Sequence, residues 1–192
     1  MKMKLSLFFL LCLSNLIFSQ RFKIIEGDLK NLKGITSYQV QFNYDKVAVH
    51  GFDSEEDFLK DKIEKRKNNP EKAEAFERDW FLNREKYYHP AYIEFFNDFF
   101  KEGECKIDEN GTYLMKVNVV WVYPGYLVEP AKVSAIIDFY NVKDLNAKLL
   151  SIKFDKVIGY EKNAYVAEEY ERFIGAYKKL AKNLALQIKR VL

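Results

Sequence analysis

The spacing of the hydrophobic residues changes along this chain, and that change is the strongest constraint on its fold. Apolar and polar residues alternate in four runs, at residues 38–44, 113–123, 133–139 and 150–158. Such alternation is typical of strands with one buried face. Between the first two runs, and again after the last, apolar residues recur every three or four positions, as in amphipathic helices. The order of these segments predicts an α+β fold.

The first helical segment, residues 53–101, is rich in charges of both signs and is expected to expose polar helix faces. Asp53 or Ser54 can cap a first helix, and Asn69 with Pro70 can open a second. Pro90 is expected to end this second helix at His89, because the residue before a proline disfavours the α conformation. A third helix is predicted directly after it.

The strand expected at residues 113–123 follows a short strand near Cys105 and a tight turn at Asn110 and Gly111. Its odd-numbered residues, Trp121 and Tyr123 among them, are all apolar, which predicts that they form the core face. The two later alternating runs would continue it as an antiparallel meander. Apolar residues at spacings of three and four from Val166 to Val191 predict one long carboxy-terminal helix, with Gly175 allowing a close approach to the sheet.

These elements predict an antiparallel sheet of four to five strands. The long carboxy-terminal helix would pack on it, together with two to three helices inserted after the first strand. No internal repeat and no second domain is indicated.

The amino terminus predicts export. Residues 1–19 have a basic start, an apolar stretch and a small residue at the end, which is the pattern of a secretory signal peptide. Residues 20–192 would then form the mature chain as a single α+β domain with no transmembrane span. Cys12 stands among leucines, so we expect no lipid anchor and a periplasmic or secreted protein. Cys105 would be the single cysteine left, without an internal disulfide partner.

The charge and the motifs exclude several classes of function. The formal net charge of +3 argues against nucleic-acid binding, which requires a strongly basic surface. The single scattered glycines form no phosphate-binding loop, and no serine lies in a nucleophile motif. Neither His50 nor His89 lies in a metal-binding motif. We therefore predict no catalytic residue, no metal and no cofactor, and a hydrolase or metalloenzyme is the least favoured reading.

The stretch WVYPGYLVEPAK, residues 121–132, is the best functional candidate. Pro124 and Gly125 suit the centre of a type II turn, and a second proline follows at position 130. One interpretation is a plain connector between strands. The other is a rigid contact loop that exposes apolar residues, which often mark a partner site. Its predicted contact residues are Tyr126, Leu127, Val128 and Glu129.

The high aromatic content allows a second reading. Exposed rings can stack against sugars, and the candidates for such a glycan or small-ligand surface are Trp80, Tyr87 and Tyr88, together with Tyr126. Burial of most aromatic residues in the core is the alternative explanation. Exposure of three of these rings in a concave site would favour a ligand, whereas their burial under the carboxy-terminal helix would favour a protein contact.

The segments YLMKVNVVWVYPGY, AKVSAIIDFYN and YKKLAKNLALQIKRVL, in this order, carry a resemblance. Over roughly residues 35–192 the chain resembles uncharacterised exported proteins of Gram-negative bacteria. It is also distantly similar to envelope α+β modules such as the amino-terminal domain of the Tol-system translocation protein and the curli-secretion lipoprotein. The resemblance implies an exported, non-enzymatic protein that acts by contact with an envelope protein, and it assigns no functional residue. Partner identity and oligomeric state stay open.

Overall fold

The structure, a computed structural model, describes residues 22–100, 103–126, 129–159 and 168–192. The predicted signal peptide and its cleavage point therefore lie outside the described residues. Seven strands form one mixed sheet in the order β1-β7-β6-β5-β2-β4, with β3 pairing beside β2 along β5. The strands are β1 (Phe22–Gly27), β2 (Ser37–Asn43), β3 (Ala48–Val49), β4 (Lys106–Ile107), β5 (Tyr113–Tyr123), β6 (Lys132–Asn141) and β7 (Asp144–Ile158).

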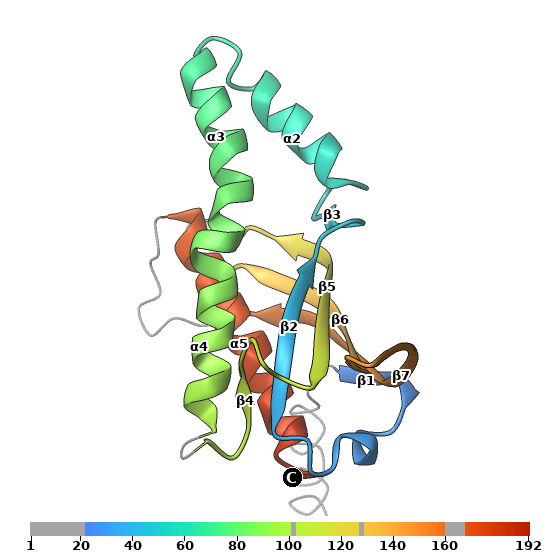
Figure 1. The fold of residues 1–192 in the computed structure, drawn as a ribbon. Helices are drawn as coiled ribbons and strands as arrows, with labels where there is room; N and C mark the ends of the chain where they lie inside the picture. The colour runs from blue at the N-terminus through green and yellow to red at the C-terminus, as the bar shows by residue number, and fades with distance from the viewer. Residues whose placement is uncertain (1–21, 101–102, 127–128, 160–167) are drawn as a thin grey trace, which may run out of the picture.

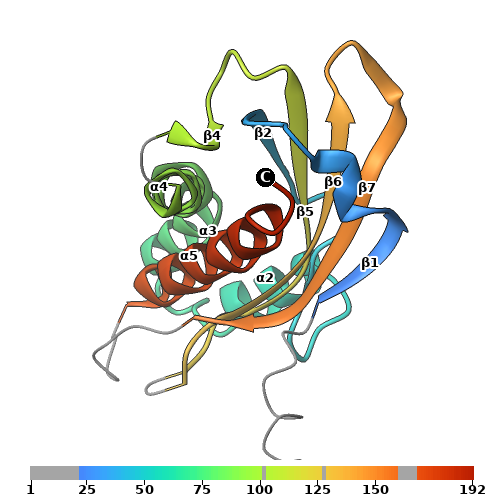
Figure 2. The ribbon, with the colours of Figure 1, turned by 90° about the horizontal axis from the view of Figure 1, so that it is seen from below.

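The helices are α2 (Glu55–Glu64), α3 (Pro70–Asn83), α4 (His89–Phe99) and α5 (Glu169–Ile188). A 3-10 turn (Leu29–Leu32) links β1 to β2, and a π-helical turn (Arg84–Tyr88) links α3 to α4. The sheet curves around α5, with α4 beside that helix (Figure 2). The hairpin of α2 and α3 projects beyond the sheet at the end where β3 lies (Figure 1).

The mixed α/β class and the long carboxy-terminal helix are confirmed, but the antiparallel sheet of four to five strands is only partly right, because the sheet has seven strands and some of them pair in parallel. Strands β5, β6, β7 and β1 do form antiparallel neighbours. Strand β2, however, pairs parallel with both β4 and β5, and β3 pairs parallel with β5. The helices between β3 and β4 return the chain to the same end of the sheet, and a parallel neighbour requires such a crossover.

The expected hairpin of β4 and β5 is also wrong, because these strands lie on opposite sides of β2. The connection between them passes close to the backbone of β2. A Cβ on Gly111 would lie 2.4 Å from the carbonyl carbon of Tyr38 and 2.5 Å from the backbone nitrogen of Gln39. Gly111 therefore serves a close backbone approach in addition to its place in a turn.

The helix boundaries follow the capping signals, with one exception. Ser54 caps α2 by accepting a hydrogen bond from the Asp57 backbone N–H at 3.0 Å, and Asn69 caps α3 ahead of Pro70. The predicted break at His89 is wrong, because His89 keeps a helical backbone and the helix continues into α4. Pro90 falls in the first turn of α4, directly after the π-helical turn, where a missing backbone donor is tolerated.

Helix α5 supplies the centre of the core. Ten of its residues are buried, among them Phe173, Tyr177 and Leu184. Gly159, directly after β7, lies against this helix: a Cβ there would come within 2.6 Å of the Ala176 nitrogen and 3.0 Å of the Gly175 carbonyl carbon. The expected close approach of helix and sheet at Gly175 is therefore observed. Cys105 is buried and free, and its burial raises the pKa of the thiol to about 12.

Candidate functional site

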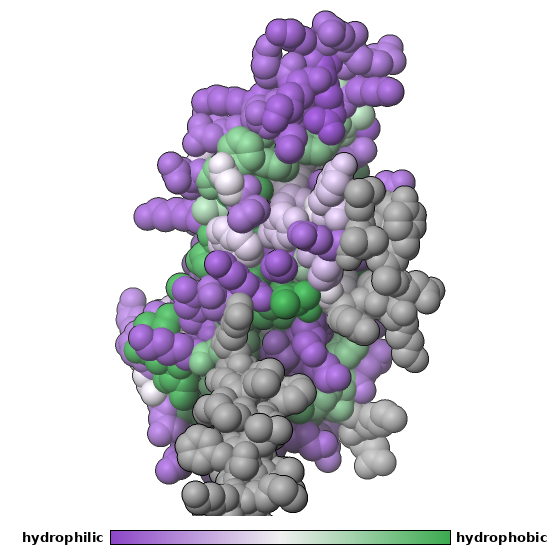
Figure 3. All heavy atoms as spheres, turned by 180° about the vertical axis from the view of Figure 1, so that it is seen from behind, coloured by the Kyte–Doolittle hydropathy of each residue, from purple (hydrophilic) through white to green (hydrophobic). Residues whose placement is uncertain are grey.

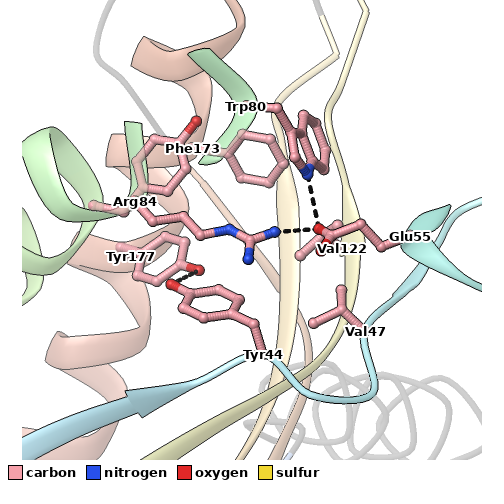
Figure 4. A pocket seen from close by; sticks show the side chains of 9 residues that line it. Tyr44, Val47, Glu55, Trp80, Arg84, Val122, Phe173 and Tyr177 are labelled. Carbon is pink, nitrogen blue, oxygen red and sulfur yellow. Dashed lines mark hydrogen bonds and ion pairs between the residues drawn. The ribbon is translucent and has the colours of Figure 1, made fainter. Parts of the chain in front are cut away.

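Two regions have the features of a functional site, a pocket at the base of the helical hairpin and a surface at the end of β5. The pocket is lined by residues from α2, α3, the π-helical turn, α5 and the sheet (Figure 4). Its centre is an ion pair between Arg84 and Glu55, whose side chains are 13% and 16% exposed. Trp80 donates its indole N–H to the same carboxylate at 2.7 Å. One carboxylate therefore ties the start of α2 to the end of α3.

Aromatic rings enclose this ion pair. The Arg84 guanidinium lies 4.1 Å from the centre of the Tyr44 ring, and the hydroxyls of Tyr44 and Tyr177 are 2.8 Å apart. The Tyr44 hydroxyl also lies 3.0 Å from Nε2 of His89, whose ring stacks on Phe42. Burial, with a smaller effect of the Arg84 charge, lowers the pKa of His89 to about 4, so the ring is neutral at pH 7.

This pocket is filled by its own side chains. The space that remains is about 10 Å³, and a cavity of that size holds at most one water molecule. Its polar groups are paired with one another, as buried charged groups must be. The pocket therefore acts as a structural clamp, which we call the Arg84 clamp (Glu55, Trp80, Arg84 and Tyr44). It offers no room for a ligand.

The residues proposed for glycan stacking lie mostly in the core. Trp80 and Tyr88 are 6% and 5% exposed and pack against Phe173 of α5. Tyr87 is half-buried and stacks on Tyr170 of the same helix, with ring centres 4.7 Å apart. These three rings therefore form no exposed concave surface, and Tyr126 is the one member of the predicted set that is well exposed.

Both histidines contact aromatic residues, and neither forms an ion pair with a carboxylate of the described part of the chain. His50 packs edge-on against Trp121 and Tyr123, and His89 is held by Phe42 and Tyr44. Among the described residues, no group of three or more His, Cys, Asp or Glu side chains is placed to hold a metal ion. None of the described helices is both long and apolar enough to cross a membrane.

A β-bulge changes the face of β5 near its end. Val119 pairs with Ala135, but Trp121 pairs with Ser134 and Val122 with Val133, so the strand gains one residue at Val120. An extra residue moves every later side chain to the opposite face. The prediction of an odd-numbered core face is therefore right up to Val119 and wrong beyond it. Val122 is buried, while Trp121 and Tyr123 are turned to the outer face and are half-buried.

A second bulge, in β7, brings a lysine to the same place. The pairing of β6 with β7 shifts between Val133 and Ala135, and Lys156 adopts a left-handed backbone with φ of 46°. Its backbone N–H is satisfied by the Ser134 hydroxyl at 2.8 Å. The Lys156 ammonium lies 5.4 Å from the centre of the Trp121 ring. A positive φ outside glycine is uncommon and costs energy, and such residues cluster at functional sites.

Hydrogen bonds hold the described ends of the loop after β5. Tyr126 and Glu129 exchange two backbone hydrogen bonds, of 2.8 and 3.2 Å, and the Glu129 carboxylate accepts from the Tyr123 hydroxyl. Arg172 of α5 donates to the Pro124 carbonyl at 3.0 Å. Gly125 has φ of 77°, as the predicted turn requires. Tyr126 is 70% exposed at the end of this construction. Leu127 and Val128, also predicted as contact residues, lie outside the described residues.

The bulges and the loop together create the second region, which we call the aromatic surface (His50, Trp121, Tyr123 and Tyr126). His50 lies 5.0 Å from Tyr123 and 5.9 Å from Trp121, measured between ring centres. Lys132 lies 5.0 Å from the centre of the Tyr123 ring. Seen from behind, residues of intermediate hydropathy gather below the strongly hydrophilic tip of the α2–α3 hairpin (Figure 3). Sequence reasoning proposed Tyr126 and Glu129 as contact residues, assigned Trp121 and Tyr123 to the core face and did not single out His50 for this surface.

Comparison of the chain with protein-family models, with curated proteins and with solved structures gave no significant match. The resemblance to exported proteins and envelope modules therefore stays a prediction.

Proposed function

We propose that this protein is exported and acts, without catalysis, by binding another envelope protein through the aromatic surface. The observation that carries this proposal is the outward turn of Trp121 and Tyr123 at the end of β5, with Glu129 joining Tyr123 to the exposed Tyr126 through its hydrogen bonds. Tryptophan and tyrosine dominate the energetically important positions of protein interfaces. Export rests on the amino-terminal sequence pattern alone.

Hydrogen bonds at the ends of the loop support the same proposal. Tyr126 and Glu129 are joined by two backbone hydrogen bonds and Pro124 is held by Arg172, so these described residues have less conformational freedom to lose when a partner binds. The aromatic residues named for an enclosed ligand site are instead packed beneath α5 or stacked on it. That arrangement favours the contact role over a concave ligand site.

A glycan is the second candidate, because a surface with Trp121, Tyr123 and His50 turned outward also suits sugar stacking. Of the four residues that the sequence suggested for glycan stacking, this surface keeps only Tyr126. His50, Trp121 and Tyr123 replace the other three. Purified polysaccharide distinguishes the two candidates. A glycan-binding protein would be retained on immobilised polysaccharide, whereas a protein that binds only another protein would not.

Crosslinking in the native envelope tests the proposal. An amine-reactive crosslinker should join a specific protein to Lys132 or Lys156, because both ammonium groups lie on the aromatic surface. The double variant Trp121→Ala, Tyr126→Asp should bind that protein at least about thirtyfold more weakly, since loss of a central aromatic contact typically costs about 2 kcal/mol or more. Mass spectrometry of the crosslinked peptides gives the readout.

The matched control is Leu82→Asp, which changes an apolar residue of α3 that is 49% exposed and is not one of the residues of the aromatic surface. Crosslinks from Lys132 and Lys156 should persist in this variant. Crosslinks that survive the double variant unchanged would overturn the proposal. Retention of the protein on purified envelope polysaccharide, lost in the double variant, would establish the glycan candidate in its place.

A further inference from the structure

A groove between α4 and α5 forms a second site, separate from the aromatic surface. Its volume is about 210 Å³, and it is lined by Phe95 of α4 and by Gly175, Lys178, Lys179 and Lys182 of α5. The four residues of α5 lie within two helical turns at spacings of three, four and seven, which places them along one side of the helix. Phe95 supplies an apolar wall, and Gly175 contributes no side chain to fill the space.

The lysines of this groove form no ion pair with a described carboxylate. Among the described residues, none of the three lysines has a carboxylate within 4.0 Å. Lysines elsewhere behave differently: Lys60 and Lys65 of the α2 region each pair with a carboxylate four residues earlier. Glu94 and Asp98, the carboxylates next to Phe95 along α4, do not line the groove.

Holding three like charges together costs free energy. Lysines at spacings of three and four on one helix repel each other. Lys178 and Lys179 are moreover half-buried, which reduces the screening of their charges by water. A multiply charged anion would offset this repulsion, and lysine ammonium groups are common ligands of phosphate.

We infer that the groove between α4 and α5 binds a phosphate group, with Lys178, Lys179 and Lys182 as its ligands. A di- or triphosphate matches the charge of three lysines better than a single carboxylate does. The volume of the groove suits a small phosphate-bearing molecule and excludes a folded domain. This site does not depend on the aromatic surface, so the two proposals can fail separately.

Calorimetric titration with pyrophosphate tests the inference. The protein should bind pyrophosphate saturably at one site, and the double variant Lys179→Gln, Lys182→Gln should weaken the affinity at least about tenfold, because charge-assisted hydrogen bonds are lost. The control variant, Lys60→Gln, Lys65→Gln, removes two exposed lysines of the α2 region and should leave the affinity unchanged. Absence of saturable binding, or an equal loss in both variants, would overturn the inference.

Vesicles distinguish a soluble phosphate ligand from a membrane surface. If the groove is the site, the protein should bind pyrophosphate. Mixed vesicles of phosphatidylglycerol and phosphatidylcholine should then sediment no more protein than vesicles of phosphatidylcholine alone. Sedimentation with the anionic vesicles in the absence of pyrophosphate binding would show that the lysines act as a flat basic surface, which contradicts a built groove. Circular dichroism of each lysine variant confirms that the fold is intact.

Discussion

Replacing Arg84 by methionine should destabilise the protein by about 3–5 kcal/mol, the usual cost of removing one partner from a buried ion pair. The Glu55 carboxylate would lose its charge partner while 16% exposed, and of its two donors among the described residues the Trp80 indole N–H would remain. The guanidinium would also leave the Tyr44 ring on which it packs. Equilibrium unfolding in urea measures the change as a shift of the midpoint.

Two further variants distinguish the cost of leaving Glu55 as an unpaired buried charge from the cost of losing the packing of the Arg84 side chain. The double variant Glu55→Gln, Arg84→Met removes both charges and should recover a large part of the loss, since no unpaired ion remains. Arg78→Met breaks an ion pair with Asp79 whose side chains are 65% and 52% exposed, and it should cost less than about 1 kcal/mol. A loss below about 1 kcal/mol for Arg84→Met would mean that the Arg84 clamp does not hold the hairpin.

Substituting alanine for Gly159 should cost about 1–3 kcal/mol, the range of an overpacked core position. The new methyl group would lie 2.6 Å from the Ala176 nitrogen and 3.0 Å from the Arg172 carbonyl oxygen. These are backbone atoms of α5 and cannot rotate away as a side chain does. The end of β7 and the helix must therefore separate, which loosens the packing along both elements. Thermal unfolding followed by circular dichroism reports the loss.

Gly34→Ala is the comparison for that experiment. A Cβ at Gly34 meets no heavy atom within 4 Å, so its cost, about 1 kcal/mol, comes from the left-handed backbone at φ of 75°. If Gly159→Ala proved no more costly than Gly34→Ala, the tight contact between β7 and α5 would be refuted.

Local signals gave the helices and most of the core correctly. Ser54, Asn69 and Pro70 act where capping rules place them, and the three- and four-residue spacing of α5 matches its buried residues. The direction of strand pairing was beyond such signals. An alternating pattern shows which residues of β2 face the core, but it carries no information on whether β5 runs parallel or antiparallel to that strand.

The polarity pattern of the sequence could not show that Trp121 and Tyr123 lie on the outer face of the sheet. Lys116 and Asn118 mark the outer face of β5 and so fix the phase of the alternation in its first part. From Val119 to Tyr123 every residue is apolar, and such a run fits either face equally well. A one-residue bulge within it leaves no trace in the polarity pattern. The partner strand does hold a signal, because Lys132 and Ser134 stand opposite the two aromatic residues.

The structural clamp and the two proposed binding sites lie in different parts of the molecule. The Arg84 clamp fixes the helical hairpin to the body, the aromatic surface lies on the outer side of the sheet, and the lysine groove lies between α4 and α5. The proposed protein partner and the proposed phosphate-bearing ligand would occupy sites that share no residue, so binding of one leaves the residues of the other site unused.

Tryptophan fluorescence tests most directly whether the bulge turns the end of β5 outward. The chain has two tryptophans, so Trp80→Phe leaves Trp121 as the only emitter and Trp121→Phe leaves Trp80. Acrylamide should quench Trp121 several-fold more strongly than Trp80, and the emission of Trp121 should lie at longer wavelength, because Trp80 is buried and Trp121 borders solvent. Equal protection of both tryptophans would place Trp121 in the core and contradict the aromatic surface.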